Sequence, residues 1–192
     1  MPAYTIISCS FDKRDRAGLV GAFYDAFFGN GVTFNGVFAW YCDADLTLEQ
    51  IVEWNQSKLD SDFVLGYDEH VKHNYRQIML AVDPFSECRL ILSNCESDIS
   101  FQCIVPEREI NKGNAGSLEH ACQRAWSQLP IQSVESYGEL GEPVGAKAIT
   151  SGKPPSADLF AMVDYDCTQH EYVRHFTLKR MNRGYLLKPN YV

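Results

Sequence analysis

Two histidine-containing segments hold the residue types that metal binding and nucleophilic catalysis require. In the first, His70 and His73 stand three residues apart beside Asp68 and Glu69. Imidazole and carboxylate groups are transition-metal ligands, and on a helix the two histidines would share a face. The HExxH pattern of metalloproteases is absent, however, and the HxxH spacing is common. We therefore favour a solvated polar turn here, and we predict no metal site and no cofactor.

The second segment places Cys167 three residues before His170, with His175 further along the chain. A thiolate and an imidazole base could form a nucleophilic pair if the segment folded back on itself. No nucleophile signature surrounds these residues, and a turn between two strands is the simpler interpretation. Together with His70 and His73, they define one hypothesis, an enzyme with a scattered His- or Cys-based site of the hydrolase or transferase type.

Two further candidates accompany the helix expected at 117–129. The Gly-rich stretch at 112–117 could hold an anion at a helix N-terminus, but it is neither a Walker A sequence nor GxGxxG. His120 and Cys122 stand two residues apart, so on a helix they point in different directions. We interpret the first as a turn followed by Ser117 as the helix N-cap, and Cys122 as a core residue.

Charge is distributed unevenly along this acidic chain. The net charge is −8. Eight acids and one lysine between Cys42 and Glu69 give that segment a charge of −7, whereas the tail from Arg174 onward carries +5. An acidic protein repels nucleic acid and anionic membranes, so we expect neither as a partner. Ion pairing between the tail and the acidic segment within one molecule explains these two charged segments as simply as binding of an external partner does.

The acidic segment contains the best-marked helix. Thr47 and Gln50 have the spacing of a capping box ahead of a helix at about 48–59. One side of this helix collects the residues expected in the core, namely Leu48, Ile51, Val52, Asn55 and Leu59.

The other sides of this helix suggest a binding surface. Glu49 and Glu53 fall on its flank, and Trp54 lies well away from the core side. Tryptophan is enriched among interface hot spots, and carboxylates speed the capture of a basic partner. We predict Asp45, Glu49, Glu53 and Trp54 as partner-binding residues. The alternative is that Trp54 packs under a neighbouring segment while the acids keep the surface hydrated.

The hydrophobic pattern predicts a single α+β domain over residues 1–192. Short connections between strands indicate a largely antiparallel sheet, with about three helices on one face and a long loop at 138–157 that could act as a lid in an enzyme. The expected strands are 3–9, 32–41, 62–67, 75–82, 87–94, 98–105, 158–165, 172–180 and 185–188, and the expected helices are 15–28, 48–59 and 117–129.

The combined features favour a protein-binding function. Seven cysteines without a CxxC pair indicate free thiols in a reducing compartment. A signal peptide and a membrane-length apolar run are not evident, so we expect a cytoplasmic protein. We predict an acidic cytosolic inhibitor or adaptor that occludes a basic partner. Immunity proteins, which neutralise a cognate toxin, are one such class. The enzyme with a scattered site is the alternative.

Overall fold

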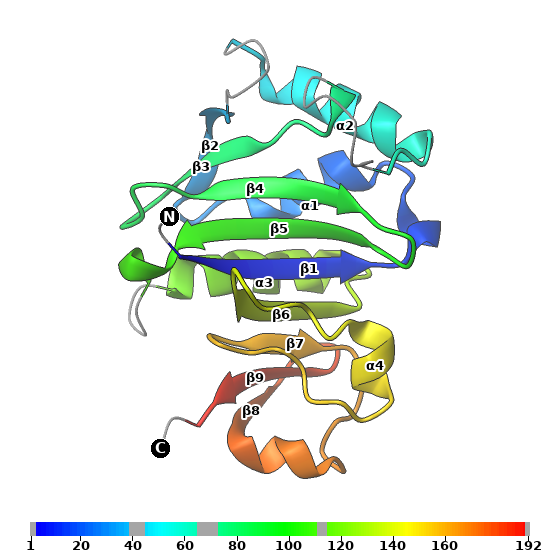
Figure 1. Ribbon diagram of the computed structural model, residues 1–192, viewed down its shortest axis with the longest axis vertical. Helices are drawn as coiled ribbons and strands as arrows, with labels where there is room; N and C mark the ends of the chain where they lie inside the picture. Colours follow the sequence, from blue (N-terminus) through cyan, green and yellow to red (C-terminus); the bar gives the residue numbers. More distant parts are fainter. Residues whose placement is uncertain (1–2, 39–44, 65–72, 111–114, 191–192) are drawn as a thin grey trace.

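The computed structural model describes residues 3–38, 45–64, 73–110 and 115–190. Its nine strands form one antiparallel sheet in the order β2-β3-β4-β5-β1-β6-β7-β9-β8 (Figure 1). The strands are β1 (Tyr4–Phe11), β2 (Val32–Val37), β3 (Ile78–Val82), β4 (Arg89–Asn94), β5 (Ile99–Pro106), β6 (Ser133–Gly138), β7 (Ala161–Val163), β8 (Phe176–Arg180) and β9 (Tyr185–Pro189). The predicted α+β fold with an antiparallel sheet is confirmed.

The helices are α1 (Leu19–Phe27), α2 (Leu48–Asp60), α3 (Gly116–Gln128) and α4 (Ala146–Thr150), with short 3-10 segments η1 (Lys13–Asp15), η3 (Glu107–Glu109) and η4 (Glu171–His175). Helices α1 and α3 lie behind the central strands in Figure 1. The ring of Phe23 in α1 stacks on Phe101 of β5 at 3.9 Å between centroids. The thiol of Cys122 in α3 lies 4.0 Å from that of Cys9 in β1. The main core therefore forms between the sheet and these helices.

Helix α2 forms as its sequence predicts. Thr47 and Gln50 make both hydrogen bonds of the capping box, so the helix begins at Leu48. On the core side, Asn55 is fully buried. Its amide accepts a hydrogen bond from the Arg76 N–H at 2.7 Å and donates one to the Arg76 carbonyl at 3.0 Å. A polar residue on the core side thus fixes α2 to the segment that leads into β3.

Strand β6 is absent from the sequence predictions although it lies at the centre of the sheet. It pairs with β1 from Thr5↔Gly138 to Ser10↔Ser133, and both of its faces are buried. Its polar and apolar residues do not alternate, so it lacks the two-residue hydrophobic repeat by which a half-exposed strand is predicted. Partners outside the strand satisfy Glu135 and Ser136: the Ser136 hydroxyl, for example, accepts from the Phe160 N–H at 3.0 Å.

Several local predictions are wrong. Residues 62–64 form a turn and an irregular segment instead of the start of a strand. The N-cap of α3 is Ala115, and Ser117 lies inside the helix. The loop at 138–157 contains the short helix α4. The turn at Met181–Gly184 does form, with a hydrogen bond from the Met181 N–H to the Gly184 carbonyl.

The basic tail and the acidic helix lie at opposite ends of the molecule. Figure 1 places α2 beyond the β2–β3 end of the sheet and the β8–β9 pair at the other end. The tail's ion pairs among described residues are Lys188 with Glu119 and Arg183 with Asp164. The predicted pairing between the tail and the described acids of the 42–69 segment is therefore wrong.

Candidate functional site

Three exposed carboxylates mark the N-terminal half of α2. Asp45 precedes the helix, while Glu49 and Glu53 lie one turn apart on it. The ion pairs between described residues include none of the three. Hydrogen bonds from its own backbone N–H and from the Thr47 hydroxyl lower the pKa of Glu49, which keeps it charged. We call these three residues the acidic face.

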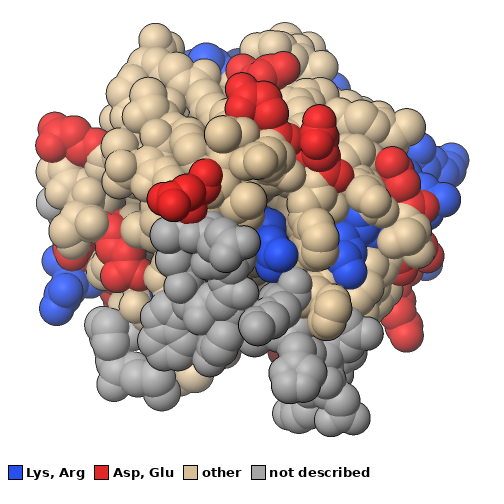
Figure 2. All heavy atoms as spheres, turned by 90° about the horizontal axis from the view of Figure 1, so that it is seen from above, with Lys and Arg blue, Asp and Glu red and all other residues tan. Residues whose placement is uncertain are grey.

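Figure 2 looks onto this end of the molecule. It shows acidic side chains in separate groups, with cationic side chains between them. The surface therefore has a patterned charge instead of a uniform negative field. Lys13 and Arg16 from a distant part of the sequence lie beside Asp62 at the end of α2, whereas Lys58 belongs to α2 itself.

Trp54 is half-buried and held from several sides. Its indole N–H donates to the Asn74 carbonyl at 3.0 Å. The Arg76 guanidinium lies 4.3 Å from the ring centroid, and the Lys58 ammonium lies 5.3 Å from it. Cation–π contacts of this kind orient an aromatic ring. These contacts hold Trp54 against the segment that contains Asn74 and Arg76, as the alternative of packing under a neighbouring segment expects.

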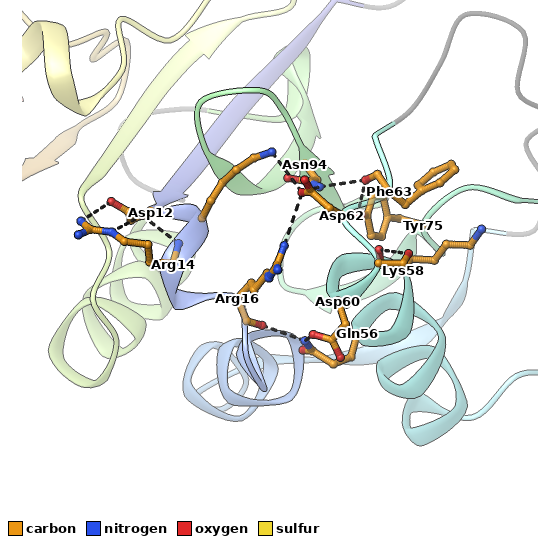
Figure 3. A network of polar contacts seen from close by, with 12 residues as sticks. Asp12, Arg14, Arg16, Gln56, Lys58, Asp60, Asp62, Phe63, Tyr75 and Asn94 are labelled. Carbon is orange, nitrogen blue, oxygen red and sulfur yellow. Dashed lines mark hydrogen bonds and ion pairs between the residues drawn. The ribbon is translucent and has the colours of Figure 1, made fainter.

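A polar network fixes the C-terminal end of α2 (Figure 3). The carboxylate of Asp62 lies 3.2 Å from the Lys13 ammonium and 3.8 Å from the Arg16 guanidinium. It also accepts from the Asn94 amide at 3.1 Å. The hydrogen bonds from Asn94 and Lys13 lower the pKa of Asp62. Counting charges along the sequence overstates this segment's negative charge, because Asp62 is compensated by cations outside it.

Gln56 extends this network to α1. Its side-chain amide donates to the Arg16 carbonyl at 2.8 Å and to the Asp60 carboxylate at 2.8 Å, and its oxygen accepts from the Val20 N–H at 3.0 Å. The two helices are thus joined by hydrogen bonds as well as by packing. The acidic face is consequently carried on a helix that is anchored at its core side and at its C-terminal end.

A buried carboxylate that sequence reasoning missed organises the other side of the sheet. Glu135 of β6 is 1% exposed. Its carboxylate accepts from the backbone N–H groups of Val144, Gly145 and Ser156 at 2.8–2.9 Å. These bonds hold both flanks of α4, so the segment expected to be a lid is fixed to the sheet at these points. The one signal in the sequence for this buried acceptor is a glutamate in the middle of the short segment Ser133–Gly138, between Val134 and Tyr137.

Helix α4 borders a polar groove. Two adjoining cavities of about 410 and 490 Å³ share Ser97, Gln132 and Lys147 among their lining residues. Two carboxylates in the first cavity already have cationic partners, since Asp12 pairs with Arg14 at 2.7 Å and Asp164 with Arg183 at 3.2 Å. Partial burial raises the pKa of Asp164. The groove has room for a small molecule. The carboxylates of Asp12 and Asp164, however, are engaged in ion pairs within the protein.

The Cys167 and His170 pair does not have the geometry of a nucleophile and its base. Cys167 is completely buried, and burial raises the pKa of its thiol, which opposes formation of the reactive thiolate. The His170 backbone N–H bonds to the Cys167 carbonyl at 3.0 Å. Its ring stacks on Tyr172 at 5.4 Å between centroids. This segment is built as a turn with a small core of its own.

The other candidates are only partly covered by the structure. His70 and residues 112–114 lie outside the described residues, so the predictions for His70 with His73 and for the 112–117 turn stay predictions. His73 is exposed, and Cys122 is in the core as predicted. Within the described ranges, there is no group of three or more His, Cys, Asp or Glu side chains placed to hold a metal ion. No described helix has the length and hydropathy needed to cross a membrane.

Comparison with known proteins gives no relative. No family model, no curated protein and no solved structure matches this chain. The function must therefore be inferred from the surfaces themselves.

Proposed function

We propose that the protein is an acidic binding module that uses the acidic face of α2 to capture and occlude a basic partner protein, as an inhibitor or adaptor does. The observation that supports this proposal is the exposure of Asp45, Glu49 and Glu53 without an ion-pair partner among the described residues. Exposed carboxylates of this kind attract a cationic surface and accelerate association. The half-buried Trp54 beside them supplies a rigid apolar edge.

The anchoring of α2 favours such a role. Asn55 fixes the helix to the segment before β3, and the network around Asp62 fixes its end. A binding surface held rigid in the free protein loses little conformational entropy when a partner binds. The buried, high-pKa thiol of Cys167 weakens the alternative of a cysteine-based enzyme.

Charge reversal with a matched control tests this proposal. The variant Glu49→Lys with Glu53→Lys changes the net charge by +4, and Glu139→Lys with Glu142→Lys makes the same change on exposed residues ahead of α4. Each protein would be immobilised, exposed to lysate of the source cells at low salt and eluted with increasing salt. We expect wild type and control to retain the same basic protein, and the α2 variant to retain ~ten-fold less.

The controls separate three outcomes. Circular dichroism and thermal unfolding would first establish that both variants fold. Equal losses in the two variants would mean that net charge alone is responsible, and undiminished capture by the α2 variant would show that the acidic face is the wrong surface. Absence of any captured basic protein would contradict the proposal as a whole.

A further inference from the structure

Strand β8 forms an open edge of the nine-stranded sheet, since its one strand partner is β9. Two backbone hydrogen bonds, one at each end of the β8–β9 pair, show which residues of β8 point their N–H and C=O groups toward β9. The Asn190 N–H bonds to the His175 carbonyl at 2.8 Å, and the Met181 N–H bonds to the Gly184 carbonyl at 3.1 Å. In an antiparallel ladder, bonded pairs alternate with non-bonded ones. Residues 175, 177, 179 and 181 therefore direct their backbone groups toward β9.

The alternate residues direct their backbone groups away from the sheet. The N–H of Phe176 bonds to the Val173 carbonyl and is satisfied within η4. For Leu178 and Arg180, no bond from the open side is formed by any residue that the structure describes. The N–H and C=O groups of these two residues are thus placed to pair with the backbone of an added strand.

The side chains around this edge are basic. Arg174 and Lys179 are exposed, and neither takes part in the ion pairs between described residues. In a protein of net charge −8, this end therefore carries a local charge opposite to that of the whole. A second copy of β8 would bring the same cations to the edge, and like charges on paired strands are destabilising.

A cavity lies at the start of the same strand. It measures about 650 Å³, and its lining includes Arg174, His170 and His175 as well as one exposed carboxylate, Glu171. The Arg174 Nε donates to the His175 Nε2 at 3.2 Å, which orients the guanidinium at the cavity wall, and its other N–H groups form no hydrogen bond with a residue that the structure describes. The guanidinium of Arg174 is suited to bind a carboxylate, and it faces the same cavity as Glu171, which a bound carboxylate must avoid.

We propose that the β8 edge and this cavity form a docking site for an extended acidic segment of another protein. The segment adds a strand beside β8, bonds to the backbone of Leu178 and Arg180, and places a carboxylate in the cavity. This site is separate from the acidic face, because the two lie at opposite ends of the sheet (Figure 1). A negative result for the β8 site would therefore leave the function proposed for α2 untouched, and the reverse is also true.

Synthetic hexapeptides with the full-length protein test this proposal. The probe is acetylated Val-Glu-Val-Glu-Val-Glu with a free C-terminus. Its controls replace Glu by Lys, or methylate alternate backbone nitrogens so that the edge hydrogen bonds cannot form. Amide exchange measured by NMR should show protection of the Leu178 and Arg180 N–H groups that increases ~ten-fold or more with the acidic peptide and is unchanged with either control.

Charge variants of the protein complete the experiment. Arg174→Glu with Lys179→Glu should weaken binding of the acidic peptide ~ten-fold or more. Arg108→Glu with Lys147→Glu, which makes the same charge change elsewhere, should leave it unaltered. Equal binding of acidic and basic peptides, undiminished binding of the methylated peptide, or protection at other amides would overturn the proposal. Concentration-dependent protection of Leu178 without peptide would overturn it in favour of a second copy.

Discussion

Asp62 is the residue at which the acidic segment meets cations from another part of the chain. Hydrogen bonds from Asn94 and Lys13 lower its pKa, so its charged form is favoured in the folded state. A lowered pKa contributes stability that is present above the pKa of an unfolded aspartate, about 3.9, and is lost as the pH falls through the folded pKa.

We therefore expect Asp62→Asn to lose stability relative to wild type at pH 7, and this difference to shrink as the pH falls below about 4. Asparagine tolerates the left-handed backbone at this position, where φ is 54°, so the variant removes mainly the charge. Urea unfolding of both proteins from pH 7 to pH 2 measures the difference, with Asp25→Asn, at an exposed position of α1, as control. A difference independent of pH would contradict this account.

At the scale of elements, Glu135 determines the position of α4. Its buried carboxylate accepts three backbone hydrogen bonds from both flanks of this helix. We expect Glu135→Ala to lower the free energy of unfolding by about 2–4 kcal/mol, because three partly buried backbone N–H groups lose their acceptor. Urea unfolding measures this loss.

Local exchange separates this role from a general destabilisation. In native conditions, the amides of Val144, Gly145 and Ser156 should exchange faster in the Glu135→Ala variant, while those of α3 change only in proportion to global stability. Glu139→Ala, on an exposed residue of the same loop, is the control. Unchanged protection at the three amides would show that Glu135 does not hold the loop.

The elements also show what a sequence can predict. Helix α2 is predictable because its capping box and its apolar side are local features of 47–60. Strand β6 is not, because its buried Glu135 and Ser136 are satisfied by residues about 20 or more positions further along the chain, namely Ser156 and Phe160. The short helix α4 depends in turn on Glu135, so it escapes prediction for the same reason.

The same distinction applies to the candidate site. The sequence predicts that Glu49 and Glu53 lie off the core side of α2, and both are exposed. It does not predict that Arg76 and Lys58 lie against Trp54, because the contact with Arg76 depends on how the chain after α2 returns to the sheet. The binding role of these residues remains a prediction.

At the level of the whole molecule, the sheet separates the exposed carboxylates of α2 from the exposed cations of β8. The acidic face lies beyond one end, on a helix anchored by Asn55 and by the Asp62 network. The basic β8–β9 pair lies at the other end (Figure 1). Because salt screens charges beyond ~10 Å, the charges at one end have little effect on those at the other.

The most direct test of partner binding by the acidic face is hydrogen–deuterium exchange of the complex with the captured basic protein. We expect reduced exchange over residues 45–60 in the complex, with residues 139–157 unchanged, because the partner covers the acidic face of α2. Protection confined to other segments, with residues 45–60 exchanging as in the free protein, would contradict the claim that the acidic face binds the partner.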